Sequence, residues 1–299
     1  MRRRGREPPD KASEVLNRQT SGSVVCPSCG RLVGVQEEKC PHCGRGNPGL
    51  WGYTRFFQSL GDDFGFVRLI IAACVVLYVL TLLVNPSAIG MKSLFSMLSP
   101  SVKSLILFGA SGAVPVFGYD RWWTVLSASW LHGSLLHILF NMMWVRQLAP
   151  ATSRIFGAGR MVVIYLVAGA AGFLLSSFAG AYLTFLPSFL RGANLTIGAS
   201  AAIFGLLGAL VLYGRRGGST AVGQQAWMYA IFLGVFGFIM PGVDNFAHLG
   251  GFLGGYAAAH WLDPRRPERI EHLMAAVIGL GLSLLAVLFS VLKGFALLG

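Results

Sequence analysis

Three stretches of the chain place polar side chains that can do chemistry inside otherwise apolar segments. Ser200 stands in GASAAIFG, His248 in AHLGGFLGG, and His137 with Asn141 in HGSLLHILFN. A serine hydroxyl becomes a good nucleophile when a neighbouring base takes its proton, and a neutral imidazole suits that task near neutral pH. Residues four apart share a helix face, so His137 and Asn141 can both donate hydrogen bonds to one oxyanion. The stretches together predict acyl transfer by a Ser-His pair.

Each of these residues also has a purely structural explanation. A serine in a membrane helix often packs or bonds to its own backbone, and a lone histidine can be satisfied by a neighbouring helix. The His137 and Asn141 pair can equally clamp two helices together. Because no Asp or Glu is placed to orient His248, we expect a dyad. The nearest carboxylate, Asp244, lies one helical turn away and is expected at the aqueous rim.

The segments that carry these residues are too apolar for a water-soluble protein. Of 299 residues, 54% are hydrophobic and only 12% are charged, which predicts an integral membrane protein. The net charge of +12 would also fit a nucleic-acid binder. However, many Arg and Lys residues lie in the N-terminal tail and in short links between apolar runs, as membrane topology requires. We therefore expect the lipid bilayer as a partner and no nucleic acid.

Seven apolar runs follow one another along the chain and predict an all-α polytopic membrane fold. The fifth run is short for a span that needs about 20 helical residues. The region between the first two runs predicts a loop that lies partly in the membrane surface. The runs cover Val67 to Val84, Trp130 to Leu148, Met161 to Ala179, Ile197 to Tyr213, Ala226 to Met240, Asn245 to Leu262 and Leu273 to Leu292.

Arginines in the links after the second, fourth and sixth runs orient the protein with its N-terminus in the cytosol. In that topology the three even-numbered runs all begin at the outer surface. A helical rise of about 1.5 Å per residue places Ser200 and His248 roughly 6 Å into their spans, and His137 roughly 10 Å into its own. All three side chains can therefore meet in one cavity that is open to the exterior.

Glycines on two of these runs explain how nucleophile and base can touch. Gly198 and Gly205 on the fourth run are expected to face Gly251 and Gly255 on the sixth. Small residues let membrane helices approach closely, because no hydrophobic drive acts between helices in lipid. The backbone N–H groups near the start of the fourth run, including that of Ser200, also lack intrahelical partners and can form part of an oxyanion hole.

The three motifs resemble those of a known family, the rhomboid intramembrane proteases. The matching stretches lie at 132–141, 198–205 and 247–255, in the family's order and on its second, fourth and sixth spans. The resemblance covers roughly residues 67–262. The seventh run resembles the arrangement of part of the family, in which one C-terminal transmembrane helix follows a six-helix core.

This resemblance implies an activity and a role for each residue. Ser200 and His248 would form the catalytic dyad, His137 and Asn141 would help bind the oxyanion, and His132 would belong to a supporting hydrogen-bond network. The reaction would be hydrolysis, without a catalytic cofactor, of peptide bonds in or near the transmembrane helices of other membrane proteins. Such substrates would have to unwind locally to offer an extended backbone.

The chain departs from the family pattern in two places. Ala201 follows the serine where the family often has Gly, a small change that the helix is expected to tolerate. Before the second span the family commonly has Trp-Arg, whereas here Thr124 follows Trp123 and the arginine is displaced to Arg121. The second departure puts the anchoring of the loop in question rather than the chemistry.

A separate constellation near the N-terminus predicts a metal site. The pattern C-P-S-C, ten residues, C-P-H-C supplies two close pairs of thiolates, and a Gly after each pair permits the tight turn that aims both sulfurs at one ion. Because this end is expected in the cytosol, a structural Zn²⁺ is favoured over two disulfides. His42 is expected to be a bystander. The predicted ligands are Cys26, Cys29, Cys40 and Cys43.

These patterns divide the chain into five parts. We expect a disordered basic tail at 1–23, a zinc-ribbon-like module at 24–46, a linker at 47–66, a protease core at 67–262, and a link with one more transmembrane helix at 263–299. The expected location is a bacterial plasma (inner) membrane, with the N-terminus in the cytosol. A protein partner for the ribbon stays open, and a purely structural role is favoured.

Alternative functions are also open. A rhomboid-like protein without proteolytic activity would bind membrane clients, but the presence of both Ser200 and His248 argues against it. A zinc-sensing membrane scaffold would depend on the four cysteines and not on Ser200. A metalloprotease is not favoured, because no H-E-x-x-H pair occurs in the apolar runs.

Overall fold

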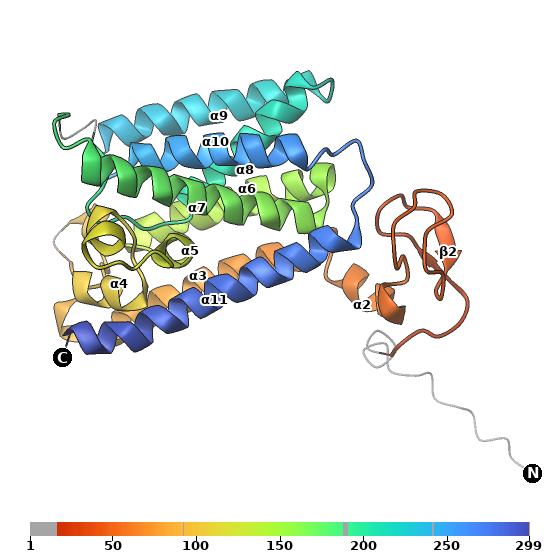
Figure 1. The fold of residues 1–299 in the computed structure, drawn as a ribbon, viewed down its shortest axis with the longest axis horizontal. Helices are drawn as coiled ribbons and strands as arrows, with labels where there is room; N and C mark the ends of the chain where they lie inside the picture. Colours follow the sequence, from red (N-terminus) through yellow and green to blue (C-terminus); the bar gives the residue numbers. More distant parts are fainter. Residues whose placement is uncertain (1–16, 92, 188–190, 241, 299) are drawn as a thin grey trace, which may run out of the picture.

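The computed structural model describes residues 17–91, 93–187, 191–240 and 242–298, and most of these lie in helices. The long helices form an elongated bundle with the cysteine-containing module beyond one end (Figure 1). Each predicted span overlaps one long helix, and the predicted fold class is confirmed. The long helices are α3 (Phe66–Leu83), α6 (Leu135–Phe156), α7 (Ala158–Tyr182), α8 (Ser200–Arg215), α9 (Thr220–Ile239), α10 (Asn245–Trp261) and α11 (Ile270–Leu298).

The lengths of these helices correct one prediction. Among the described residues, α3, α7, α9 and α11 are long and apolar enough to cross a membrane. The fifth span is not short, because α9 begins at Thr220 and runs for 20 residues after the cap that Ser219 provides. The short helices are instead α8, with 16 residues, and α10, with 17. At about 1.5 Å per residue, α8 spans about 24 Å of a hydrocarbon layer about 30 Å thick.

Helix α8 lies at the centre of the bundle and is buried from Ala201 to Leu212. It packs on α6, α7, α9 and α10. Small residues bring the backbones together, as predicted. A Cβ on Gly205 would lie 2.0 Å from the Cβ of Ala168, and a Cβ on Gly255 would lie 2.1 Å from the carbonyl oxygen of Gly205. Helices α8 and α10 are therefore in direct backbone contact.

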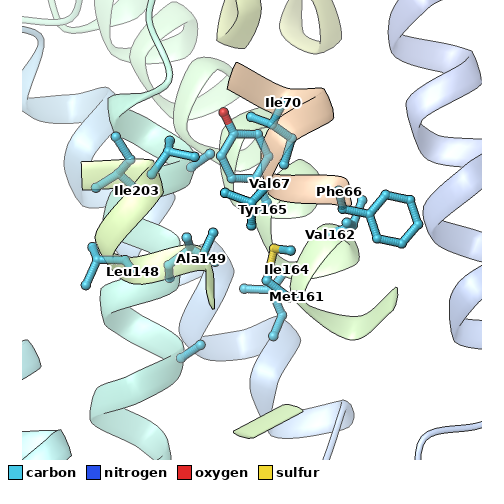
Figure 2. Packing of buried hydrophobic residues seen from close by; sticks show 14 of the residues in the cluster. Phe66, Val67, Ile70, Leu148, Ala149, Met161, Val162, Ile164, Tyr165 and Ile203 are labelled. Atoms are coloured by element: carbon cyan, nitrogen blue, oxygen red, sulfur yellow. The ribbon is translucent and has the colours of Figure 1, made fainter. Parts of the chain in front are cut away.

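A second part of the core joins the start of the chain's membrane region to the central helices. Buried apolar side chains from α3, α6, α7 and α8 meet there (Figure 2). The large side chains of α9 and α11 are in contrast widely exposed, as expected for helices that face lipid. The labelled core residues are Phe66, Val67, Ile70, Leu148, Ala149, Met161, Val162, Ile164, Tyr165 and Ile203.

The region between α3 and α6 folds into short helical pieces rather than one span. Its elements are η2 (Pro86–Ala88), η3 (Leu94–Ser96), α4 (Val102–Phe108), the π-helical turn η4 (Val114–Gly118), α5 (Thr124–Ser127) and η5 (Ala128–Trp130). The predicted start of the second span at Trp130 was wrong, because Trp130 ends η5 and Leu131 is extended. Helix α6 begins only at Leu135, where the Ser134 side chain accepts the N–H of His137.

Arg121 anchors this region despite its displacement from the family position. The guanidinium is buried and donates from Nη1 to the carbonyl oxygen of Ile106 at 3.0 Å and from Nη2 to that of Ser290 at 3.1 Å. Trp123 donates from Nε1 to the Ser290 hydroxyl at 2.9 Å. The loop is therefore pinned to α4 and to the C-terminal helix α11, which answers the question that Thr124 raised.

The N-terminal module contains a two-stranded antiparallel sheet of β1 (Ser23–Val25) and β2 (Leu32–Gly34). It connects to α3 through η1 (Leu50–Gly52) and α2 (Thr54–Ser59). Of the predicted disordered tail, residues 1–16 lie outside the described residues. Its last part is tied to the linker, since the N–H of Gln19 donates to the carbonyl oxygen of Gly52 at 2.9 Å.

Candidate active site

Ser200 and His248 meet at the start of two helices. Ser200 is the first residue of α8, and His248 lies in the first turn of α10. The Ser200 Oγ lies 2.9 Å from the His248 Nε2. The imidazole stacks on Phe204, one turn further along α8, with ring centroids 4.2 Å apart and planes inclined by 18°. The hydrogen bond and the stacked ring together fix the imidazole beside the hydroxyl.

Backbone contact between α8 and α10 sets this distance. A Cβ on Gly251 would lie 2.0 Å from the carbonyl oxygen of Ala201, so only glycine allows the observed approach. The Cβ of Ala201 finds room because Gly172 of α7 lies beside it: a Cβ there would be 2.7 Å away. The expectation that Ala is tolerated after the serine therefore has a physical basis.

The ring of His137 lies against the backbone at Gly198, two residues before the nucleophile. The N–H of Gly133 donates to Nδ1 at 3.2 Å, which leaves the proton of a neutral ring on Nε2. Gly198 has a φ of 121°. A Cβ on it would lie 2.7 Å from Nε2 and 3.8 Å from the Ser200 Oγ. The Gly198 position is therefore close both to the His137 ring and to the Ser200 hydroxyl, and the expectation that Gly198 faces α10 was wrong.

Asn141 and His132 both contact His137. Asn141 is buried and donates from Nδ2 to the carbonyl oxygen of His137 at 2.8 Å, which uses one of the two amide N–H groups. The fully buried ring of His132 packs edge-on against His137, with centroids 5.2 Å apart. Within the described part of the chain, neither nitrogen of His132 has a hydrogen-bond partner. His132 therefore contacts His137 ring against ring, and its place in a supporting hydrogen-bond network stays a prediction.

The backbone at the start of α8 offers further donors. Since Ser200 is the first helical residue, its N–H and the next ones have no partner within the helix, and the positive end of the helix dipole points at this position. If Arg215 is placed at one boundary of a hydrocarbon layer about 30 Å thick, Ser200 lies about 8 Å from the other boundary. This value replaces the depth of roughly 6 Å expected from the sequence, because the residues just before Ser200 are not helical.

Asp244 is half-buried, and both of its carboxylate oxygens accept hydrogen bonds. Its Oδ1 accepts the N–H of Ala247 at 3.0 Å, and its Oδ2 accepts the hydroxyl proton of Ser176. In the described residues, His248 Nδ1 has no hydrogen-bond partner. The geometry is thus that of a Ser-His pair without an orienting carboxylate.

The surrounding segment matches a known protein family. A profile described as the Rhomboid domain matches residues 119–265, which include all the residues placed above at the pair and beside it. This segment is a rhomboid domain. Sequence motifs and family match therefore agree on the same segment.

Curated relatives of this rhomboid protein come from a plant and a bacterium. RHOMBOID-like protein 4 of Arabidopsis thaliana is 34% identical over 168 residues, which are 54% of this chain and 39% of the relative. Rhomboid protease GluP of Bacillus subtilis is 32% identical over 189 residues, or 62% of this chain and 35% of the relative. Putative rhomboid protease YdcA of the same bacterium is 32% identical over 143 residues, or 46% and 65%. The first two matches thus cover less than half of each relative.

The N-terminal cysteines of the rhomboid protein form a cluster that can hold a metal ion. Their four sulfur atoms all lie within 4.8 Å of one another. The Cys26 and Cys43 sulfurs are 3.8 Å apart and those of Cys29 and Cys40 are 3.7 Å apart. Tetrahedral coordination with Zn–S bonds of about 2.3 Å requires sulfurs about 3.8 Å apart, whereas a disulfide requires about 2.05 Å. The spacing fits a metal and not two disulfides.

The two cysteine pairs sit in matching turns. The N–H of Gly30 donates to the carbonyl oxygen of Cys26, and that of Gly44 donates to that of Cys40, both at 2.9 Å. Both glycines have a positive φ, 71° and 73°, as predicted. Burial raises the pKa of the Cys43 thiol to about 12, so metal binding there would release protons.

Glu268 docks this module onto the rhomboid domain. The carboxylate accepts the N–H of Arg160, at the start of α7, at 3.0 Å and lies 3.7 Å from the guanidinium of Arg45. Its carbonyl oxygen accepts from Arg45 and from the Ser28 hydroxyl, both at 3.0 Å. The module therefore holds the link between α10 and α11, at the opposite end of α10 from His248 (Figure 1). A cavity of about 570 Å³ lies at this junction, away from the Ser-His pair.

Proposed function

We propose that this protein is an intramembrane serine endopeptidase that cleaves peptide bonds in or near transmembrane helices of other membrane proteins. The single observation that carries the proposal is the 2.9 Å contact between the Ser200 Oγ and the His248 Nε2. The name of the Bacillus relative, Rhomboid protease GluP, supports the same activity. The finer assignments below belong to the same proposal.

The first half of the reaction forms an acyl-enzyme. Nε2 of His248 takes the hydroxyl proton as Ser200 Oγ attacks the scissile carbonyl carbon. The oxygen becomes negative and accepts hydrogen bonds from the backbone N–H at the start of α8 and from Nε2–H of His137. The free amide N–H of Asn141 can add a third. His248 then gives its proton to the departing amine as the C–N bond breaks.

The second half hydrolyses the ester. His248 takes a proton from water, the hydroxide attacks the acyl carbon, and the proton returns to the Ser200 oxygen as the acid leaves. Water must reach Ser200 at a depth of about 8 Å, so we expect an opening to the exterior above the pair. A transmembrane substrate helix must unwind to expose its backbone, so we expect small and helix-breaking residues near the cleavage point.

The cysteine module completes the proposal on the other side of the membrane. We assign Cys26, Cys29, Cys40 and Cys43 as ligands of a structural Zn²⁺, with the N-terminus in the cytosol. The relatives come from a bacterium and a plant, and a bacterial plasma membrane stays our prediction. Transmembrane proteins are the expected substrates.

The activity is tested in proteoliposomes with a model transmembrane substrate. We expect cleavage by the parent, and its loss in Ser200→Ala and in His248→Ala. Equal cleavage by the parent and Ser200→Ala would contradict the proposal. A parent that binds the substrate without cleaving it would instead support the non-proteolytic, client-binding alternative.

A further inference from the structure

One buried hydroxyl, that of Ser176, bonds both to the segment that precedes Ser200 and to the residue that caps the helix of His248. Ser176 lies on α7 and is fully buried. Its Oγ accepts the N–H of Ala193 at 3.2 Å, in the segment that leads to Ser200. The same hydroxyl donates its proton to Oδ2 of Asp244, the residue that caps the helix of His248. Nucleophile and base are thus joined a second time, away from their own contact.

On the side of the nucleophile, the segment from Ala193 to Gly198 has little freedom. The carbonyl oxygen of Ala193 accepts the N–H of Ala113 at 3.0 Å. The N–H of Gly198 donates to the carbonyl oxygen of Ala128 at 2.9 Å. A Cβ on Gly192 would lie 2.2 Å from the carbonyl oxygen of Ser176, so the segment lies directly on α7. A shift at Ala193 would therefore pass along a short, tethered backbone to the start of α8.

On the side of the base, Asp244 sets the first turn of α10. Its Oδ1 accepts the N–H of Ala247, and its backbone oxygen accepts the N–H of His248 at 3.2 Å. A capping carboxylate fixes the orientation of the first helical turn. Because Ser176 holds the other carboxylate oxygen, the direction in which His248 leaves the helix depends on α7 as well as on α10.

The neighbouring serine shows that burial alone does not explain this arrangement. Ser177 is also fully buried, yet its hydroxyl has no hydrogen-bond partner in the described residues. A buried serine on α7 is therefore tolerated without a partner. The paired hydroxyl of Ser176 has a role that its neighbour lacks.

We propose that Ser176 and Asp244 are positioning residues that hold Ser200 and His248 at bonding distance through one shared hydroxyl. The inference deepens the proposed protease function and rests on it. Ser176 touches no reacting atom, so its effect acts through the geometry of the pair. A displacement of the order of 1 Å at a reacting group can lower a rate by about 100-fold.

The test compares Ser176→Ala with Ser177→Ala in detergent-solubilised full-length protein, with a fluorophosphonate probe as the substrate. We expect the maximal rate of labelling to fall about 10- to 100-fold in Ser176→Ala, with half-saturation by the probe and the thermal midpoint as in Ser177→Ala. Equal maximal rates in the two variants would overturn the proposal.

Substitutions of Asp244 test the same hydrogen bond from its other partner. We expect Asp244→Ala to lower the rate as Ser176→Ala does, and Asp244→Asn, which keeps a capping oxygen, to recover part of it. The double variant should be no slower than the slower single one, because both remove one connection. If the rate losses of the two single variants multiply in the double variant, Ser176 and Asp244 act independently, and this would contradict a role through one shared hydrogen bond.

A measurement without catalysis separates this inference from the proposed activity. The ¹⁵N shift of His248 Nε2 in labelled protein reports the bond to Ser200 whether or not the protein cleaves anything. We expect Ser176→Ala to move this signal toward that of Ser200→Ala, and Ser177→Ala to leave it in place. An unmoved signal in Ser176→Ala would sink the positioning role, whereas an inert parent with the expected shifts would sink only the protease function.

Discussion

Replacement of Gly251 by Ala tests the helix contact that brings Ser200 and His248 together. A Cβ at this position would lie 2.0 Å from the carbonyl oxygen of Ala201, whereas such carbon and oxygen atoms normally stay about 3.3 Å apart. Relief of the clash requires α8 and α10 to separate by about 1.3 Å at this level. The Oγ to Nε2 distance of 2.9 Å would then grow to about 4 Å, beyond hydrogen-bond range.

The expected result is a loss of about 100-fold in the rate of acylation, together with about 1–3 kcal/mol of destabilisation from overpacking. The assay is the rate at which a fluorophosphonate labels the protein in proteoliposomes, read beside its thermal midpoint. Gly281→Ala is the matched control, because a Cβ there meets no atom within 4 Å. A folded Gly251→Ala that labels as fast as Gly281→Ala would refute the reasoning.

Three further predictions concern other parts of the molecule. Gly198→Ala forces a residue with a side chain to adopt a φ of 121° and displaces the Nε2 of His137. Substrate turnover in liposomes should therefore fall by about 100-fold, and turnover at the parent rate would contradict this. Cys40→Ser should lower the zinc content, measured by elemental analysis, from one ion per chain to none, whereas His42→Ala should keep it. Glu268→Gln leaves the fully buried Arg45 without its carboxylate and should destabilise the docked module by about 3–5 kcal/mol, seen as faster proteolysis at 47–66. Glu271→Gln is the matched control, because Glu271 forms an exposed ion pair with Arg269. Equal proteolysis of the Glu268→Gln and Glu271→Gln variants would contradict the docking role.

Much of the membrane fold could be predicted because apolar runs and links differ sharply in composition. The ends of the helices were harder, since they depend on caps rather than on hydropathy. Helix α6 begins after Ser134, whose side chain accepts the N–H of His137, although apolar residues extend further back to Trp130. Helix α9 extends beyond its apolar stretch because Ser219 caps it before a polar start that includes Gln224 and Gln225.

The pairing of Ser200 with His248 could be predicted from motif order and span parity, but its supports could not. Phe204 has a sequence signal, because it lies one turn after Ser200 on the same helix face. Ser176 has none: its partners lie 17 and 68 residues further along the chain. Only the folded backbone brings such partners together.

Two arginines hold parts of the structure together in a way that the sequence did not show. Arg121 was interpreted only as a displaced loop arginine, yet it is buried and bonded to the backbone of α4 and α11. Arg160 was counted among the cytosolic charges, yet its Nη1 and Nη2 bind carbonyl oxygens of the link before α11 at 2.8 Å. A guanidinium can serve both purposes, and composition alone does not distinguish them.

The chemistry of the Ser200 hydroxyl can be measured directly. Protein treated with a fluorophosphonate is digested, and the modified residue is identified by mass spectrometry in the parent and in His248→Ala. The dyad predicts a single adduct on Ser200 that is lost when the imidazole is removed. An adduct on another serine, or undiminished labelling of Ser200 in His248→Ala, would contradict it.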